Sequence, residues 1–517
     1  MRTPHIALLL AVGCNGNPDD TDDSEARDPR FDGVAEAIEA HLPSSGATAM
    51  SIAIYEGGEV VWAEAFGPTR VDGDTPATAS TLFQLGSTTK VFTSLALLQD
   101  VEAGRYALDD SLTELLPELE PPAAQADWWG QLTPHRLLSN QSGLIDHVVW
   151  DESNSGSLAG FAYDTYPDNA GFMNRPGAFW NYSNPGFSYA GLVVEEHATE
   201  LFPAVMASRV FARLGMNRTT QERDDVAADG DYALGHGYVV TPQGSTRETD
   251  ITSLDQVPHA PFSVPAGVST WSTPTEVLRL ADFLIHGDPE ILSDALRAEM
   301  MTAHLSLLST PDDSGYGYGL FVRPGFNLPD GYHPSPLLEH GGNTLQYSSA
   351  LYILPEQDFA VSVLSSGVGT DFGPVVVPAL QLAEGLAPAQ TAPGFTIDTD
   401  RFVDHTGSFD GTANIGPMEV ALDDDGNLEW TLPLLDQYGY DYEPALSAVS
   451  STLFIGEVDG QQVELTFIDD GDTTSRWLRN RSFVGTRAEA PVALQPAPFL
   501  PARPTLSARI PRRDLRP

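Results

Sequence analysis

Apolar residues recur at helical spacing where the folded part of the chain begins, at Phe31, Val34, Ile38 and Leu42. This spacing places them on one face and predicts an amphipathic helix. Two strand-like runs follow, Ser51–Tyr55 and Glu59–Phe66, separated by Gly57-Gly58. Because paired glycines favour the backbone conformations of a tight turn, we expect the two runs to form a β-hairpin.

The middle of the chain has the pattern of successive helices separated by long loops. Thr133-Pro134 marks one helix start, since a cap residue followed by proline is common there. Strand patterns return at Ser348–Leu354 and Phe359–Leu364, with Pro355–Asp358 as the turn between them. Strands at both ends of a helix-rich middle predict an α+β fold, in which one antiparallel sheet is flanked by helices.

The pattern changes after Leu386–Gly394, a stretch rich in alanine and proline that indicates a linker. From Phe402 to Val484, short alternating runs lie between turns rich in aspartate and glycine. These runs are Met418–Leu422, Leu428–Leu432, Leu453–Val458 and Val463–Ile468. Alternation with a period of two over many short segments predicts a small all-β barrel or sandwich.

Composition and charge narrow the classes of function. Of the 517 residues, 41% are apolar, which is enough to build substantial cores. The chain carries 72 acidic and 26 basic residues, a net charge of −46. Such a surface repels phosphate backbones, so we expect no nucleic-acid partner. The 12 histidines include no closely spaced ligand pair, so we expect neither a zinc site nor another cofactor.

The amino-terminal residues have the layout of a short export signal. Ile6–Val12 is an apolar run too short to span a bilayer as a helix, and one arginine precedes it. Leu10–Cys14 resembles a bacterial lipoprotein cleavage box, with Ala11 where leucine is more common. The resemblance implies an exported lipoprotein, anchored in the membrane only through lipid on Cys14 and facing the periplasm or the cell exterior. A plain signal with an incidental cysteine is the alternative.

Two polar segments complete the division of the chain. Asn15 to Asp32 is strongly acidic and is expected to be a disordered tether, and Pro491–Pro517 is rich in proline and arginine and is expected to be a tail. The predicted segments are 1–13 as signal, 14–30 as tether, 31–384 as the α+β domain, 385–397 as linker, 398–488 as the β domain and 489–517 as tail.

Lys90 is the only lysine, since all the other basic residues are arginines. Arginine cannot release its proton near neutral pH, whereas a lysine amine with a lowered pKa can. Ser87 lies three residues before Lys90, at the start of the helical pattern Val91–Ala103, so both side chains share one face. Ser87 as a simple helix cap is the alternative. A capping box, however, prefers Glu or Gln where Lys90 stands, and a cation there opposes the helix dipole.

Ser-x-x-Lys at a helix start resembles the first motif of the β-lactamase and penicillin-binding-protein family. Other segments similar to its class C and esterase-like branch are Phe83–Lys90, Leu108–Asp110, Leu137–Leu144 and Pro265–Thr270. The resemblance extends from about Phe31 to Ala383. It implies an antiparallel sheet beside an all-helical lobe with the active site between them. It also implies Ser87 as the nucleophile that forms an acyl-serine intermediate, with Lys90 as its activating partner.

The second family motif, Tyr-x-Asn, is matched by Tyr182-Ser183-Asn184. The resemblance places the Tyr182 phenol near Lys90, where it would take the Ser87 proton and later activate the deacylating water. Lys90 is the alternative general base, and the sequence does not choose between them. Asn184 would position Lys90 and the substrate carbonyl. The simpler interpretation is that Asn184-Pro185 only caps and starts a helix.

The third motif is usually Lys-Thr-Gly, with His-x-Gly in many esterase-like members, and two segments match the latter. His340-Gly341-Gly342 enters the hairpin Ser348–Leu364 and is favoured, because the motif should lie on the strand beside the site. His405-Thr406-Gly407 fits better as the opening turn of the β domain. His340 would orient substrate or share a proton with Tyr182.

The motifs together predict a serine hydrolase for a small-molecule or peptide substrate, namely an ester, a D-amino-acid peptide or a β-lactam. The backbone N–H groups of Ser87 and Asn343 would stabilise the oxyanion. Without lysine in the third motif, an esterase or peptidase is favoured over a true β-lactamase. No Gly-x-Ser-x-Gly segment supports an α/β-hydrolase. The alternative is a catalytically silent sensor or binding protein on the same fold.

The β domain has a resemblance of its own. Phe402–Gly407 and Gly456–Phe467 are similar to parts of the lipocalin-like appendage of some peptidase and esterase members. That resemblance implies a domain that covers the site or drives assembly into an oligomer.

Cys14→Ser is expected to release the protein from membranes, because the lipid would have no thiol to attach to. A globomycin-type inhibitor of lipoprotein processing should also block maturation. Fractionation of cells followed by mass spectrometry of the amino terminus measures both effects. A mature amino terminus well beyond Cys14 would contradict the assignment.

Overall fold

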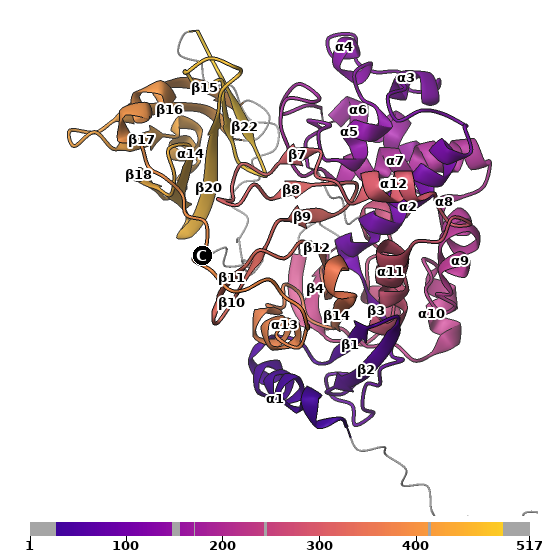
Figure 1. The fold of residues 1–517 in the computed structure, drawn as a ribbon. Helices are drawn as coiled ribbons and strands as arrows, with labels where there is room; N and C mark the ends of the chain where they lie inside the picture. Colours follow the sequence, from indigo (N-terminus) through magenta and orange to yellow (C-terminus); the bar gives the residue numbers. More distant parts are fainter. Residues whose placement is uncertain (1–26, 147–155, 170, 242–245, 412–414, 490–517) are drawn as a thin grey trace, which may run out of the picture.

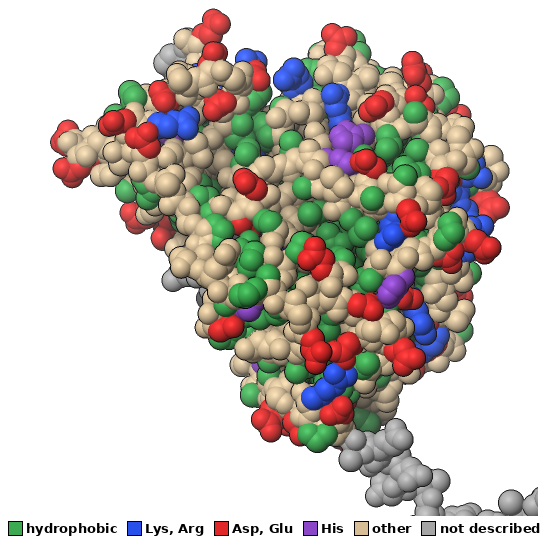
Figure 2. Space-filling model, in the orientation of Figure 1, with side chains coloured by type: hydrophobic (Ala, Val, Ile, Leu, Met, Phe, Trp, Pro, Cys, Tyr) green, Lys and Arg blue, Asp and Glu red, His purple; other side chains and the backbone are tan. Residues whose placement is uncertain are grey.

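The computed structural model describes residues 27–146, 156–169, 171–241, 246–411 and 415–489. Cys14, the signal and nearly all of the tail lie outside these ranges. Figure 1 shows a larger body of sheet and helices with a smaller barrel beside it. Acidic side chains are spread over the face shown in Figure 2, in line with the net charge of −46. Among the described helices, none has the length and apolar character needed to cross a membrane.

An eight-stranded antiparallel sheet forms the centre of the larger body, in the order β2-β1-β14-β13-β12-β9-β8-β7. The strands are β1 (Met50–Glu56), β2 (Glu59–Phe66), β7 (Leu305–Ser306), β8 (Gly315–Tyr316), β9 (Phe321–Arg323), β12 (Leu337–Asn343), β13 (Ser348–Leu354) and β14 (Phe359–Ser365). Both predicted hairpins form, as β1–β2 and β13–β14. Pairing of β1 with β14 joins them into one sheet, so the predicted α+β fold is confirmed.

Helices cover this sheet and form a lobe beside it, purple and magenta in Figure 1. The α-helices are α1 (Asp32–His41), α2 (Thr89–Glu102), α3 (Leu112–Leu115), α4 (Ala126–Trp129), α5 (Pro134–Leu138), α6 (Tyr166–Asn169), α7 (Asn184–Ala198), α8 (Phe202–Val205), α9 (Ala212–Leu214), α10 (Arg223–Asp229), α11 (Pro274–His286), α12 (Asp294–Met300), α13 (Gly373–Leu380) and α14 (Pro433–Tyr438). α2 and α7 pack against each other, which brings together the two segments that carry the first two motifs.

Both faces of the sheet are buried, which explains why β1 and β14 are apolar almost throughout. Met50 and Ile52 belong to the core that includes residues of α1 and α13. Ala53 belongs to the other core, which includes residues of α2 and α11. Since successive side chains of a strand point to opposite faces, a strand covered on both sides needs apolar residues at nearly every position.

Short two-stranded ribbons complete the larger body. They are β3–β6 (Phe83–Gln84 with Trp271–Ser272), β4–β5 (His236–Val240 with Thr246–Asp250) and β10–β11 (Phe326–Leu328 with Gly331–His333). The β3–β6 ribbon matters for the site, because the chain passes from β3 through Leu85 into the turn that holds Ser87.

The carboxyl-terminal region folds as a closed antiparallel barrel, which decides between the barrel and the sandwich. Its strands are β15 (Gly407–Gly411), β16 (Gly416–Leu422), β17 (Leu428–Thr431), β18 (Tyr442–Ala448), β19 (Leu453–Val458), β20 (Gln461–Ile468), β21 (Trp477–Arg479) and β22 (Val484–Arg487). β15 pairs with β22 and closes the ring. His405 is buried at the barrel's opening turn, 2.7 Å from both Ser475 Oγ and the Ser451 carbonyl oxygen, which supports its structural interpretation.

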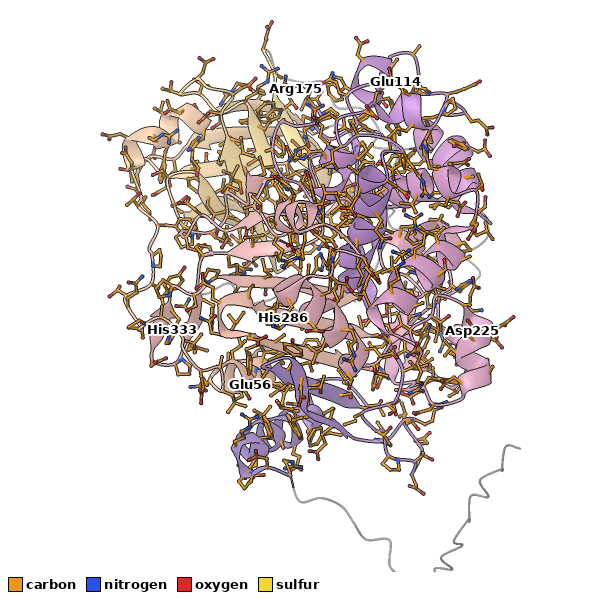
Figure 3. All side chains as sticks on the ribbon, turned by 45° about the vertical axis from the view of Figure 1, so that its right-hand side comes forward. Glu56, Glu114, Arg175, Asp225, His286 and His333 are labelled. Atoms are coloured by element: carbon orange, nitrogen blue, oxygen red, sulfur yellow. The ribbon has the colours of Figure 1, made fainter. Side chains whose placement is uncertain are left out.

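A buried arginine connects the barrel to the larger body. Arg479 donates hydrogen bonds to the carbonyl oxygens of Trp180 and Leu307, at 2.9 and 3.0 Å. Beside it, Trp477 of β21 contacts Phe179 edge to face, with ring centroids 5.3 Å apart. Arg175, labelled in Figure 3 near the junction, reaches Asp470 of the barrel at 4.0 Å. Apolar and charged contacts together hold the barrel against the segment that precedes α7.

The described residues begin at Arg27, within the last part of the predicted tether 14–30. Pro29–Phe31 form a 3-10 turn and α1 begins at Asp32. Arg27 holds both carboxylate oxygens of Glu64, at 2.7 and 2.6 Å, and Arg30 pairs with Glu56 at 2.7 Å. Arg27 and Arg30 therefore attach the segment before α1 to β2 and β1, respectively. Glu56 at the end of β1 is labelled in Figure 3.

Arg479→Ala is expected to lower the free energy of unfolding by about 2–4 kcal/mol, because the carbonyl groups of Trp180 and Leu307 would remain buried without a donor. Denaturant unfolding measures this change. Arg476→Ala is the matched control, since its side chain is 57% exposed on the same barrel and a change of at most about 0.5 kcal/mol is expected. Equal effects of the two substitutions would contradict the anchoring role.

Candidate active site

Ser87 lies in a 3-10 turn, Gly86–Thr88, that leads directly into α2. The residue at the amino-terminal cap of α2 is Thr88, and no side chain makes a capping hydrogen bond there. The Ser87 hydroxyl instead lies 3.0 Å from the Lys90 amine. The interpretation of Ser87 as a helix cap is therefore wrong, and its half-buried hydroxyl is available for chemistry.

Lys90 is completely buried, yet its amine has three polar neighbours. Besides the Ser87 hydroxyl, these are Asn184 Oδ1 at 2.7 Å and the carbonyl oxygen of Ala266. Burial lowers the pKa of Lys90 well below that of an ordinary lysine; the nearby Asp146 carboxylate partly opposes this shift and Arg481 adds to it. The neutral amine is therefore favoured far more than at an exposed lysine.

The neutral amine has two hydrogens and one lone pair, and its neighbours fix where each points. The carbonyl oxygen of Ala266 can only accept hydrogen bonds, and so can Asn184 Oδ1. The two hydrogens are used on these oxygens, so the lone pair is left for the Ser87 hydroxyl. This is the arrangement that a general base requires.

Asn184 begins α7 but does not cap it. Ser183 is the cap, accepting a hydrogen bond from the Gly186 N–H at 3.3 Å. The Asn184 side chain instead donates through Nδ2 to Asp146 Oδ1, and the Asn184 N–H donates to the same oxygen, both at 2.9 Å. Because a carboxylate only accepts, Asp146 fixes the orientation of the amide and turns its Oδ1 toward Lys90.

Tyr182 lies over the same pair of residues. The Lys90 amine is 4.9 Å from its ring centroid, and its phenol is hydrogen-bonded to the Ser87 side chain. Burial raises the pKa of Tyr182 above that of an ordinary tyrosine, although Arg481 and the bond to Ser87 lower it in part. The phenol is therefore held in its neutral form, in contact with the serine oxygen.

His340 lies on β12 as predicted and is buried. Its Nδ1 is 2.6 Å from the Gly341 carbonyl oxygen and must carry the proton, so Nε2 accepts from the Tyr316 hydroxyl at 3.1 Å. Its ring packs against Tyr182 with centroids 6.4 Å apart. The structure thus brings His340 to the site through ring packing behind Tyr182.

Glycines allow three backbone segments to meet at Ser87. A Cβ on Gly342 would lie 1.9 Å from the Leu85 carbonyl oxygen and 2.7 Å from the Ser87 nitrogen. A Cβ on Gly86 would lie 2.6 Å from the Asn343 nitrogen. Gly267, with φ of +130°, packs against Gly86 in the same way. The backbone nitrogens of Ser87 and Asn343 therefore lie at one junction, as the predicted oxyanion donors must.

Two charged residues of the site are absent from the sequence prediction. Asp146 comes two residues after the family-like segment Leu137–Leu144, and that proximity was the available signal. Arg481 comes from the turn between β21 and β22 of the barrel. Its Nη2 is 3.3 Å from Asp146 Oδ2, and its guanidinium carbon is 4.4 Å from the Tyr182 ring centroid. No local pattern marks a residue that reaches the site only through packing between domains.

The chain is similar in sequence to known proteins. The chain is 23% identical over 349 residues to Protein flp of Staphylococcus aureus (strain NCTC 8325 / PS 47), which covers 65% of this chain and 62% of that protein. The chain thus spans less than two thirds of the length of this relative.

Solved structures show the same fold. The octameric penicillin-binding protein homologue from Pyrococcus abyssi matches 88% of this chain and 100% of its own, with a TM-score of 0.57 and 22% identity. The D-amino acid amidase from Ochrobactrum anthropi SV3 matches 68% and 95%, with a TM-score of 0.53 and 21% identity. Residues 34–384 of the 517 match the family described as Beta-lactamase, so the chain belongs to that family.

Proposed function

We propose that the protein is a serine hydrolase that acts through a covalent acyl-serine intermediate. The observation that carries this proposal is the buried Lys90 amine, which lies 3.0 Å from Ser87 Oγ and donates to two acceptors, Asn184 Oδ1 and the Ala266 carbonyl oxygen. Burying a lysine side chain is costly, and here burial favours the neutral amine that the proposed chemistry requires.

In the proposed acylation step, the Ser87 oxygen attacks the substrate carbonyl carbon while the Lys90 amine takes the hydroxyl proton. The N–H groups of Ser87 and Asn343 stabilise the negative oxygen of the tetrahedral intermediate. When this intermediate collapses, the bond to the leaving group breaks and the leaving group takes the proton from the Lys90 ammonium, which restores the neutral amine. Water then attacks the acyl carbonyl carbon while Lys90 takes one of its protons. Lys90 returns this proton to Ser87 Oγ as the bond between Oγ and the acyl carbon breaks and the acid is released.

The opposite pKa directions favour Lys90 over Tyr182 as the base for acylation. Burial lowers the pKa of the amine and raises the pKa of the phenol, so the neutral forms of both dominate. A neutral amine accepts a proton, whereas a neutral phenol donates one. We therefore assign proton acceptance to Lys90, with Tyr182 as a neutral hydrogen-bonding partner of Ser87 and with Asn184 holding Lys90 in place.

For substrate, we favour an ester or a D-amino-acid peptide or amide over a β-lactam. The third motif has His340 instead of lysine, and this ring faces Tyr182 and Tyr316 rather than offering a cation. The fold likeness to a D-amino acid amidase is compatible with an amide.

We also propose that the protein forms an oligomer, since the Pyrococcus abyssi homologue of the same fold is octameric. In addition, we propose that it is an exported lipoprotein anchored to the membrane through Cys14.

A panel of an activated p-nitrophenyl ester, a D-alanine amide and nitrocefin tests the reaction class, with Ser87→Ala as the control. We expect turnover of the ester or the amide by the wild-type chain and none by Ser87→Ala. Intact-protein mass spectrometry after a brief reaction should show an acyl adduct on Ser87. Binding of these compounds with neither turnover nor adduct would indicate the silent sensor instead.

Lys90→Arg is expected to reduce the acylation rate by about 10²–10⁴-fold, because the guanidinium cannot take the Ser87 proton near neutral pH. Stopped-flow measurement of the burst with a p-nitrophenyl ester gives this rate. The thermal melt of the variant, compared with that of Ser87→Ala, verifies that both are folded. A near wild-type burst would show that Lys90 supplies charge and does not carry a proton.

The acylation rate should rise with pH and reach a plateau once Lys90 loses its proton. Because burial lowers the pKa of this amine from 10.5, the midpoint of the rise is expected well below that value. Asp146 and Arg481 act on the midpoint in opposite directions, upward and downward respectively. A pH profile of kcat/KM for a non-ionising ester measures the midpoint, and a midpoint near that of a free lysine would contradict the assignment.

A further inference from the structure

Arg481 reaches the mouth of the site from a different domain. Its guanidinium lies 4.4 Å from the Tyr182 ring centroid, and Tyr182 is hydrogen-bonded to Ser87. Its Nη2 lies 3.3 Å from Asp146, which in turn orients Asn184. The barrel thus places a cation against Tyr182, which in turn contacts Ser87.

Most of the hydrogen-bonding capacity of this guanidinium is not used within the described part of the chain. A guanidinium has five N–H donors, and among the described residues Arg481 has one side-chain acceptor, Asp146 Oδ2, at a long 3.3 Å. Its side chain is 60% exposed, whereas that of Asp146 is 11% exposed. Asp146 also accepts two hydrogen bonds from Asn184. A molecule that enters from solvent therefore meets the cation of this pair.

The turn that carries Arg481 is held in place on both sides. Arg479 is buried and bonded to two carbonyl oxygens of the larger body. Asn480 donates through Nδ2 to the Glu464 carbonyl oxygen at 2.8 Å, and its Oδ1 accepts from the Ser482 N–H at 2.8 Å. The backbone of this turn is therefore fixed before a ligand binds, so that binding has to order only the Arg481 side chain.

We infer that Arg481 is a specificity-determining residue that binds a carboxylate of the substrate beside the acyl group under attack. A planar guanidinium matches the two oxygens of a carboxylate, and such charge-assisted bonds are strong. On a chain with a net charge of −46, a local cation at the site mouth has a clear selective effect, since most of the surface repels anions. This inference rests on the proposed hydrolase function and names the substrate class of the same site.

Matched ester pairs test the inference. One pair is p-nitrophenyl butyrate and mono-p-nitrophenyl succinate, which place a methyl or a carboxylate at the end of the acyl chain. The other is phenyl acetate and 4-carboxyphenyl acetate, which place the carboxylate on the leaving group. For each pair the readout is the ratio of kcat/KM for the carboxylate ester to kcat/KM for the neutral ester. This ratio cancels any loss of activity that both esters share.

Arg481→Gln is expected to lower this ratio about tenfold or more in at least one pair, and Arg481→Glu to lower it further. Arg476→Gln is the control: it removes an equally exposed cation that stacks on Trp477 of the same barrel, and the ratio should stay within about twofold. Equal losses on both esters of each pair would overturn the inference, because Arg481 would then act only through Asp146 or Tyr182. Unchanged ratios would overturn it as well.

Calorimetry separates failure of this inference from failure of the proposed function. Titration of Ser87→Ala with 4-carboxyphenyl acetate and with mono-p-nitrophenyl succinate measures binding without turnover. Adding Arg481→Gln should weaken the binding of at least one of them about tenfold or more. If the wild-type chain hydrolyses no ester but Arg481 still controls this binding, the hydrolase proposal fails while the carboxylate site stands. Equal binding by both variants would overturn the carboxylate site.

Discussion

The site depends on one physical constraint, the burial of a single lysine amine against a serine hydroxyl. An ammonium taken out of water is costly, so burial favours the neutral form of Lys90. Neutral amines are poor structural groups but effective bases. The two oxygens that receive its hydrogens come from Asn184 at the start of α7 and from Ala266 in the chain that leads to β6. Packing of α2 against α7 is therefore as much a requirement of the chemistry as the Ser87–Lys90 spacing.

The same constraint explains where the fold uses glycine. The Lys90 amine must be shielded from water while Ser87 stays accessible to substrate. The backbone segments on either side of Ser87 must therefore pack without intervening side chains. Gly86, Gly267 and Gly342 supply that contact, since a Cβ on each would overlap neighbouring backbone atoms. The contact also aligns the nitrogens of Ser87 and Asn343. Close approach of three strand and turn segments thus buries the lysine and brings together the two proposed oxyanion donors.

A feature could be predicted from the sequence when the residues that form it lie close together along the chain. The Ser87–Lys90 motif, the hairpins β1–β2 and β13–β14 and four of the eight barrel strands depend on neighbours along the chain, so local patterns and the family resemblance indicated them. His340 was placed on the correct strand, but its partner Tyr316 comes from β8, which no local pattern connects with it. Closure of the barrel depends on β15 meeting β22 across the whole domain. Asp146 and Arg481 are 335 positions apart, and their contact depends on docking of the barrel, to which Arg479 and Trp477 contribute.

That last contact gives the barrel a part in the charge balance of the site. An Asp146 carboxylate alone would stabilise the Lys90 ammonium and raise the pKa of the amine, which opposes its use as a base. The Asn184 amide nevertheless needs this carboxylate, because an acceptor at that point is what turns Oδ1 toward Lys90. Arg481 resolves the conflict, since its cation offsets the charge of Asp146 while leaving Oδ1 to Asn184. The larger body holds Ser87 and Lys90, the proposed nucleophile and base, and the barrel supplies the cation that lets an orienting carboxylate lie beside a neutral lysine.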